Sequence, residues 1–125
     1  MNEIIRNKVQ NACVYLALKI PNLSLTKMLK LLYIIDYTSM KELGVPMLWV
    51  KYYAWKNGPV AKDVYFACVN TSSNDILNLC SAISVMTRPN DMVDNFATAR
   101  YIKPVKEFDD GNFSDYEIDL LDRIV

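Results

Sequence analysis

The sequence predicts a mostly α-helical domain of the α+β class, with about five helices and a small β-hairpin or short sheet. Three observations support this prediction. Long stretches carry apolar residues at helical spacing, a short aromatic stretch precedes a Gly-Pro turn, and the 125 residues are 52% hydrophobic and 22% charged. A chain of this length and composition can bury a core without a disulfide or a metal. We therefore expect a single domain over residues 1–125.

Two long helices are predicted in the first third of the chain. The first spans 2–20, where apolar residues recur on one helical face until Pro21 interrupts the pattern. The second follows Ser24, a residue type favoured at the N-cap, and ends near Glu42, with Gly44 as a left-handed stop. Because the second helix is apolar on more than one face, we expect it near the centre of the domain.

A strand and a third helix are predicted in the middle of the chain. Residues 49–55 are rich in aromatic and β-branched types, which favours a strand. The turn Asn57-Gly58-Pro59 follows. Proline is tolerated in the first turn of a helix, so we expect a third helix over 60–69.

The second half of the chain carries one strong local signal. Residues 75–83 predict a short fourth helix, 84–94 are ambiguous, and 98–105 predict a strand whose Pro104 lies at a sheet edge. The strong signal is Ser114-Asp115-Tyr116-Glu117, a capping box that predicts the start of the last helix.

The residue types exclude several kinds of chemistry. The chain has no histidine, which rules out a Ser–His–Asp triad, a Cys–His dyad and a His-ligated metal. Cys13, Cys68 and Cys80 are widely spaced, and we expect them to be reduced and packed as small hydrophobic residues. No motif calls for a metal or a cofactor. We therefore expect a protein that is not an enzyme.

The apolar stretches do not predict a membrane protein. The N-terminal residues lack the unbroken apolar segment of a signal peptide. The longest apolar stretch is interrupted by Lys27, Lys30 and Asp36, so it is too charged to span a bilayer. The expected location is the cytoplasm.

Charge is unevenly distributed along a chain whose formal net charge is zero. Residues 1–67 contain nine Lys/Arg and four Asp/Glu, a balance of +5, and the remaining residues contain five and ten, a balance of −5. Two interpretations are open. Either the surface is polarised and steers a charged protein partner, or the two halves pack together and their charges intermingle.

Asp36 is the polar residue of greatest interest, because it lies in an otherwise apolar helix beside Ile35 and Tyr37. A buried carboxylate without a partner is expensive, so a hydrogen-bond partner is expected. Our first interpretation is a structural hydrogen bond to backbone N–H groups near Gly58. The alternative is a catalytic acid.

Aromatic residues and lysines alternate in one short segment. Trp49, Lys51, Tyr53, Trp55 and Lys56 form the candidate partner interface. Three interpretations are open: the rings fill the core, they bind a protein, or they stack on nucleic-acid bases.

Three motifs together resemble the Panacea domain, the SocA-like antitoxin family that also includes phage-associated GepA-like proteins. The sequence LTKMLKLLYIIDY resembles the family's "L-x-K-L-L-Y-x-x-D" helix. The sequence YYAWKNGPV, followed by Val64-Tyr65, resembles its "Y-x-A-x-x-x-G-P-V" segment, and FSDYEIDLL resembles its "F-S-x-x-E-x-x-x-L" helix start. The resemblance runs in order from the first helix to the last. The family-matching positions are Lys30, Leu32, Tyr33, Asp36, Gly58, Pro59, Val60 and Tyr65.

The resemblance implies a helical domain with a small β element that neutralises a cognate protein toxin by direct binding. Family members are paired with many unrelated toxins, and some deliver the toxin to a protease. The matching positions would be mainly structural, with Asp36 fixing the Gly58-Pro59 turn against the helix. The alternative function is a nucleic-acid-binding regulator that uses the basic first half of the chain.

The resemblance also raises an expectation about the last helix. Family members usually continue well beyond the "F-S-x-x-E" motif. We therefore expect a domain that lacks their C-terminal helices and leaves Leu120, Leu121 and Ile124 partly exposed. Such an exposed apolar face would favour a homodimer.

Overall fold

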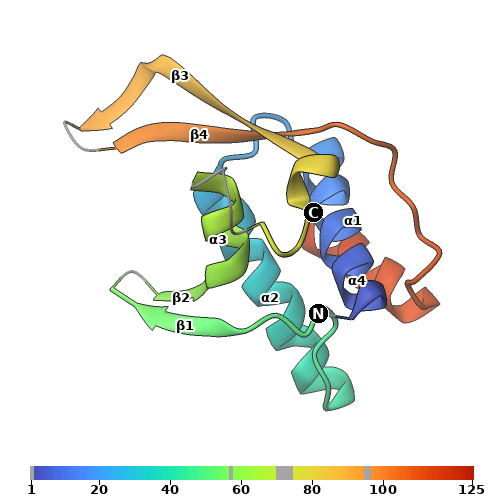
Figure 1. Cartoon of the computed structure of the whole chain (residues 1–125). Coiled ribbons are helices and arrows are strands. Elements are labelled where there is room, and N and C mark those ends of the chain that lie inside the picture. The colour runs from blue at the N-terminus through green and yellow to red at the C-terminus, as the bar shows by residue number, and fades with distance from the viewer. Residues whose placement is uncertain (1, 57, 70–74, 95–96) are drawn as a thin grey trace.

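The computed structural model describes residues 2–56, 58–69, 75–94 and 97–125, with only the backbone described for 88–94 and 97–98 (Figure 1). These residues form four α-helices, one short 3₁₀ helix and two antiparallel hairpins. This confirms the mostly helical α+β class. The elements in chain order are α1 (Glu3–Lys19), α2 (Leu25–Leu43), β1 (Tyr52–Trp55), β2 (Gly58–Ala61), α3 (Lys62–Val69), η1 (Leu79–Ser81), β3 (Ile83–Asp94), β4 (Ala97–Pro104) and α4 (Asp115–Ile124).

The helix ends follow their local signals. The Ser24 side chain accepts a hydrogen bond from the backbone N–H of Lys27 at the start of α2. Gly44 ends α2 in the left-handed conformation, with φ of 79°. The capping box is formed by Ser114 and Glu117, each side chain accepting from the other's backbone N–H. These three predictions are confirmed because caps depend on residues only a few positions apart.

The prediction that Pro59 lies in the first turn of the third helix is wrong. Pro59 lies in β2, where it is paired with Ala54 of β1, and α3 begins only at Lys62. Gly58 has a φ of 115°, which lets the chain reverse directly into a second strand. A proline without an N–H is tolerated in such a two-stranded ribbon because both strands are edges. The strand preceding the turn is also shorter than predicted, since it begins at Tyr52.

The expected fourth helix is likewise replaced by other structure. Only the turn η1 is helical, and Ile83 opens the long strand β3. The Asp75 carboxylate accepts from the backbone N–H groups of Leu79 and Cys80 at 2.8 and 3.0 Å. A local side-chain bond of this kind competes with a continuing helix. The ambiguous stretch 84–94 is β3, and the predicted strand at 98–105 is confirmed as β4.

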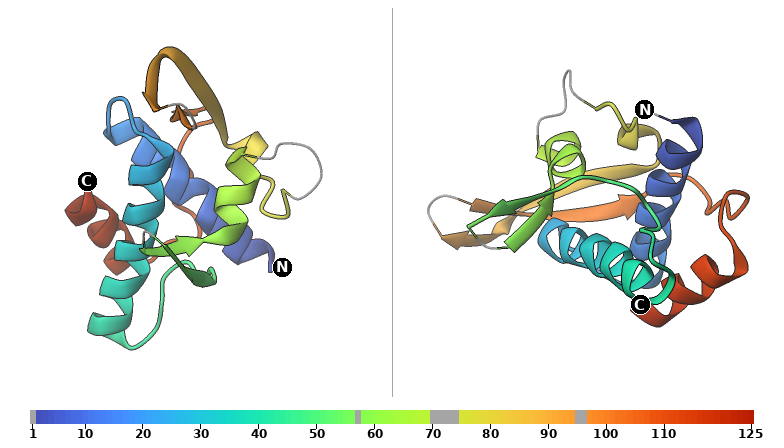
Figure 2. Two further views of the ribbon diagram at one scale, coloured as in Figure 1. Left: turned by 90° about the vertical axis from the view of Figure 1, so that its left-hand side faces the viewer. Right: turned by 90° about the horizontal axis from the view of Figure 1, so that it is seen from below.

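Both hairpins project toward the same side of the molecule, while α1 and α4 pack at the opposite side (Figures 1 and 2). The β3–β4 hairpin is tied to the body at its base. There the backbone N–H of Ile102 donates to the Leu23 carbonyl oxygen at 2.8 Å. The backbone N–H of Val105 donates to the Ala82 carbonyl oxygen at 2.9 Å, which extends the β3–β4 pairing by one step toward η1. The β1–β2 hairpin packs on α2 and α3.

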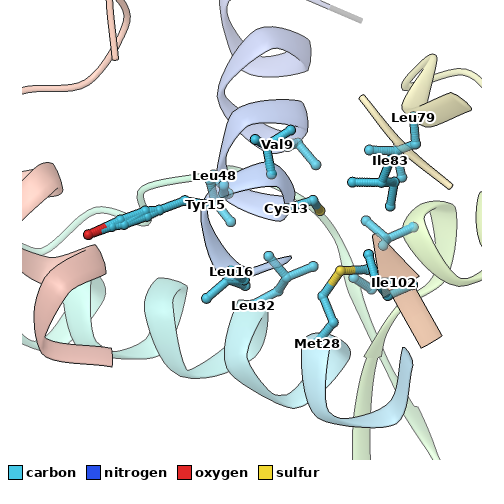
Figure 3. Close-up of a cluster of buried hydrophobic side chains, with 14 of the residues drawn as sticks. Val9, Cys13, Tyr15, Leu16, Met28, Leu32, Leu48, Leu79, Ile83 and Ile102 are labelled. Carbon is cyan, nitrogen blue, oxygen red and sulfur yellow. The ribbon is translucent and has the colours of Figure 1, made fainter. Parts of the chain in front are cut away.

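The core lies where α1 crosses α2 beneath the base of β3 and β4. Figure 3 shows side chains of α1, α2, η1 and the two strands meeting there. The helix α2 buries one face, as expected of a central helix, but it also exposes large apolar side chains along another face. The labelled core residues are Val9, Cys13, Tyr15, Leu16, Met28, Leu32, Leu48, Leu79, Ile83 and Ile102.

The helix α1 is anchored to distant segments by polar side chains. Gln10 donates to the Leu77 carbonyl oxygen at 2.7 Å. The fully buried Asn11 accepts from the backbone N–H of Asp109 at 2.8 Å. Lys8 and Glu117 form an ion pair at 2.5 Å. These contacts connect α1 with the chain that precedes η1 and with the chain that follows β4.

The helix α4 does not have the exposed apolar face expected of it. Leu120 and Leu121 are fully buried in the core, and Ile124 is half-buried. The apolar residues of α4 find partners on α2, with which the helix is in contact. The surface on which we expected a homodimer is therefore not formed by Leu120 and Leu121.

The charge distribution supports intermingling at the α4 contacts. Lys8 pairs with Glu117, and Arg123 pairs with Glu42 at 2.8 Å. Both pairs join the basic half of the chain to the acidic half. The lysines of α2 and of the β1–β2 hairpin take no part in these pairs.

The cysteines fulfil the packing prediction only in part. Cys13 and Cys68 are buried in the core, and all three cysteines are free thiols. Burial raises the pKa of both thiols, that of Cys68 to about 12. The prediction is wrong for Cys80, which lies exposed in η1.

Candidate functional site

Asp36 ties α2 to the segment that leads into β1. Its side chain is only 5% exposed. Its Oδ1 accepts hydrogen bonds from the backbone N–H groups of Met47 and Leu48 at 3.0 and 2.7 Å. The Tyr52 hydroxyl lies 2.8 Å from Oδ2 and 3.0 Å from the Leu32 carbonyl oxygen. The predicted kind of partner is correct, but the prediction that it lies near Gly58 is wrong.

Burial has the largest effect on the pKa values of Asp36 and Tyr52. It raises the pKa of the Asp36 carboxyl, against the opposing effect of the hydrogen bonds from Leu48, Tyr52 and Met47. Burial, together with the neighbouring Asp36 carboxylate, also raises the pKa of Tyr52. Both carboxylate oxygens have protein partners. Asp36 lines neither the cavity between α2, the β1–β2 hairpin and α3 nor the one between α3, η1 and β3. This arrangement is that of a structural tie.

The family-matching positions divide between the tie and a surface groove. Leu32 is fully buried. Tyr33 packs edge-on against Tyr52, with 5.4 Å between ring centroids, and stacks with Tyr37. Gly58 supplies the positive φ of the turn. The other four matching positions, Lys30, Pro59, Val60 and Tyr65, lie together in the groove.

The groove has a volume of about 600 Å³ and lies where α2, the β1–β2 hairpin and α3 meet. Trp55 and Lys56 of the candidate partner interface line it beside the four matching positions. We call this site the hairpin groove. Its lining residues are Thr26, Leu29, Lys30, Trp55, Lys56, Pro59, Val60 and Tyr65.

Two lining residues escaped the sequence analysis, namely Thr26 and Leu29. Thr26 lies four residues before Lys30 and three before Leu29, so its side chain is next to both on the surface of α2. Helical spacing from Lys30 could have identified Thr26, and then Leu29, once that lysine was known to line a groove. The groove itself could not be predicted, since it requires the hairpin at 52–61 to lie beside α2.

Ring-to-ring contacts hold the aromatic wall of the groove in place. Trp55 packs edge-on against Tyr65 and Phe66, with centroid distances of 5.1 and 6.2 Å. The Lys62 Nζ lies 5.0 Å from the centroid of the Tyr53 ring and 5.8 Å from that of Phe66. These contacts join the hairpin to α3 on one side of the groove.

The candidate interface residues are all exposed. The exposed fractions are 55% for Trp49, 43% for Tyr53 and 39% for Trp55, and Lys51 and Lys56 are exposed as well. Core filling is therefore excluded as the role of these three rings.

Trp49 is unusual in its backbone as well as in its exposure. It adopts a left-handed conformation with φ of 58°. A bulky residue rarely has positive φ, and the conformation is energetically unfavourable. The flanking residues explain how it is held, because the backbone N–H of Leu48 is bound to Asp36 and β1 begins at Tyr52. Trp49 does not line the hairpin groove.

The fold and the groove define a small helical domain that presents an aromatic, lysine-bearing hairpin at its surface. Residues 28–125 match the family model described as Antitoxin SocA-like, Panacea domain, and the chain belongs to this family. The match begins within α2, so it does not include α1. No curated protein and no solved structure matches the chain. None of the described helices is both long and apolar enough to cross a membrane.

Proposed function

We propose that this chain is an antitoxin that neutralises a cognate protein toxin by direct binding. The toxin contacts the exposed aromatic residues of segment 49–55, and the hairpin groove lies beside them. The observation that carries the proposal is the exposure of Trp49, Tyr53 and Trp55 on a segment whose other side is fixed to α2. Membership of the SocA-like antitoxin family supports it. Tryptophan and tyrosine are enriched among the residues that dominate binding at protein interfaces.

The conformation of Trp49 supports the same proposal. An exposed tryptophan at positive φ gains little from burial in its own chain. Unfavourable conformations of this kind concentrate at functional sites. A partner that covers the indole ring would supply the burial that the isolated domain lacks.

The proposal needs no chemical step. The chain has no histidine, and the buried Asp36 carboxylate is engaged by the protein itself. Binding alone would inhibit the toxin by covering a surface that it needs. The proposed location is the cytoplasm, and delivery of the bound toxin to a protease is an extension of the same proposal.

Co-expression with the neighbouring open reading frames tests the proposal. We expect one neighbour to arrest growth, this chain to restore it, and the two proteins to purify together. The double variant Trp49→Ser/Tyr53→Ser should lose rescue and co-purification. The matched control Leu18→Ser/Val105→Ser removes two equally exposed apolar side chains elsewhere and should retain both. Neighbours that neither arrest growth nor bind this chain would contradict the proposal.

A second candidate function is a nucleic-acid-binding regulator. The observation in its favour is that exposed Lys51 and Lys56 alternate with the exposed rings of the same segment. Binding to DNA or RNA that weakens steeply with salt would support it. Absence of binding at low salt would eliminate it.

A further inference from the structure

We propose that the hairpin groove binds an acidic peptide segment of the partner, in which one large apolar side chain is flanked by carboxylates. This inference rests on the proposed function, because it specifies the part of the toxin that the groove receives.

The groove is large enough for one substantial side chain together with adjoining backbone. Its volume of about 600 Å³ lies within the range of about 300–1,000 Å³ typical of ligand-binding pockets. Leu29, Trp55, Val60 and Tyr65 supply apolar lining from α2, the hairpin and α3. An apolar side chain of the partner would be surrounded by these groups.

The groove is formed before any partner arrives. Leu29 is buried against the core, and Trp55 is held against Tyr65 and Phe66 of α3. Strand β1 is fixed by its hydrogen-bonded pairing with β2, in which Tyr53 lies opposite Val60. Binding to such a preformed site avoids much of the entropy lost when a flexible surface becomes ordered.

The charges that line the groove have one sign. Lys30 from α2 and Lys56 from the hairpin are both lining residues, and the lining contains no Asp or Glu. Among the residues described by the structure, neither lysine has a carboxylate within 4.0 Å. A partner segment with carboxylates on both sides of its apolar side chain would complement both lysines.

The nearby acidic residues of α2 do not neutralise these lysines. Asp36 is buried in its contacts with Met47, Leu48 and Tyr52. Glu42 is paired with Arg123 of α4 near the other end of α2.

The same charges favour a peptide over a nucleic acid. A polyanion gains affinity from many simultaneous lysine or arginine contacts to phosphate. The groove offers two lysines, and the chain as a whole has no net charge. Two lysines beside an apolar lining are better matched to a few carboxylates beside an apolar side chain.

Selection from a displayed library of random ten-residue peptides tests the inference on the full chain. We expect enrichment of peptides that carry Asp or Glu around a large apolar residue. The charge-reversed variant Lys30→Glu/Lys56→Glu should bind the selected peptides at least ten-fold more weakly. Lys30→Gln/Lys56→Gln should be intermediate, and it guards against misfolding caused by charge reversal. The matched control Lys19→Glu/Lys103→Glu makes the same charge change at exposed lysines outside the groove and should bind like the wild type.

Three outcomes would overturn the inference: no enriched peptide, enrichment without acidic residues, or equal weakening by both charge-reversed variants. Tighter binding of a single-stranded oligonucleotide than of any selected peptide would also overturn it. These outcomes are separable from failure of the proposed function. If Lys30→Glu/Lys56→Glu still rescues growth from the toxin, the proposed antitoxin function stands and the proposed role of the groove is wrong. If the groove binds acidic peptides but the chain rescues growth from no toxin, the proposed role of the groove stands and the antitoxin function is wrong.

Discussion

The two sides of segment 47–55 differ sharply although they belong to the same few residues. Met47 and Leu48 are buried and donate their backbone N–H groups to Asp36, and the Tyr52 hydroxyl contacts the same carboxylate. Trp49, which lies between Leu48 and Tyr52 in the sequence, is exposed, and so is Trp55. One side of the segment thus holds the fold together, and the other side carries the surface that we propose for the partner. Substitutions on the two sides should therefore have separable effects on stability and on binding.

The largest expected effect is on stability, and it concerns the side of segment 47–55 that contacts Asp36. Asp36→Ala leaves the N–H groups of Met47 and Leu48 and the Tyr52 hydroxyl without their acceptor. Loss of buried hydrogen-bond partners should reduce the free energy of unfolding by about 2–4 kcal/mol. Urea denaturation of the purified protein would measure this loss.

Asp36→Asn is the control for this prediction. Its amide oxygen can still accept from the two backbone N–H groups, and it carries no charge that burial would penalise. We expect a loss of about 1 kcal/mol or less. Equal stability of the alanine variant and the wild type would show that the segment is held by apolar packing alone.

The next effect in size is on the outer side. Trp55→Ala removes the ring that lines the hairpin groove, and a truncated tryptophan at an interface typically costs about 2 kcal/mol or more in binding. We expect the affinity for the toxin to fall by roughly 30-fold or more. Titration calorimetry would measure it, with Leu18→Ser as the control. An unchanged affinity would place the toxin elsewhere on the surface.

A smaller effect is expected at Trp49, where substitution should not lower the stability of the fold. Trp49→Gly relieves the left-handed backbone, and glycine adopts positive φ without a Cβ penalty. Stability should stay the same or rise by up to about 1 kcal/mol, while toxin binding weakens. Thermal unfolding and titration of the same sample would check both. A clear loss of stability would mean that the indole ring supports the fold.

The smallest effect concerns the contact between α2 and α4. The Arg123 guanidinium holds the pKa of Glu42 at about 2, below its ordinary value of 4.5, with a further contribution from the Tyr116 hydroxyl. A lowered pKa stabilises the fold above pH 4.5, and this contribution is lost as the pH falls toward about 2. In Glu42→Gln this part of the acid destabilisation should be absent. Circular dichroism between pH 5 and pH 2 would show a flatter profile, and Arg123→Gln should flatten it too.

Those elements of the fold that depend on local signals were predictable from the sequence. The caps at Ser24 and Ser114 and the stop at Gly44 involve residues within a few positions of one another. Strand pairing involves distant residues, so it was harder to predict. Pro59 is equally compatible with a helix start and with an edge strand, and only pairing with β1 decides between them.

The candidate site shows the same division between local and distant information. Trp49, Tyr53 and Trp55 were identifiable from composition, yet their exposure depends on which face of the segment docks on α2. For Asp36 the need for a partner could be deduced from its apolar neighbours. The identity of the partners could not, because segment 47–52 reaches Asp36 only after the chain has turned at Gly44.

The polar anchors of α1 have a kinetic consequence. Lys8 and its partner Glu117 are separated by 109 positions, and Asn11 accepts its hydrogen bond from the similarly distant Asp109. At a synthesis rate of about 5–20 residues per second, these partners are made on the order of 5–20 seconds apart. The Lys8 and Asn11 side chains of α1 therefore stay hydrated until their partners have been synthesised, and α1 completes its contacts late in folding. Contacts between such distant positions slow folding relative to a bundle of sequential helices. Refolding from urea should accordingly be slower than the high helix content alone would suggest.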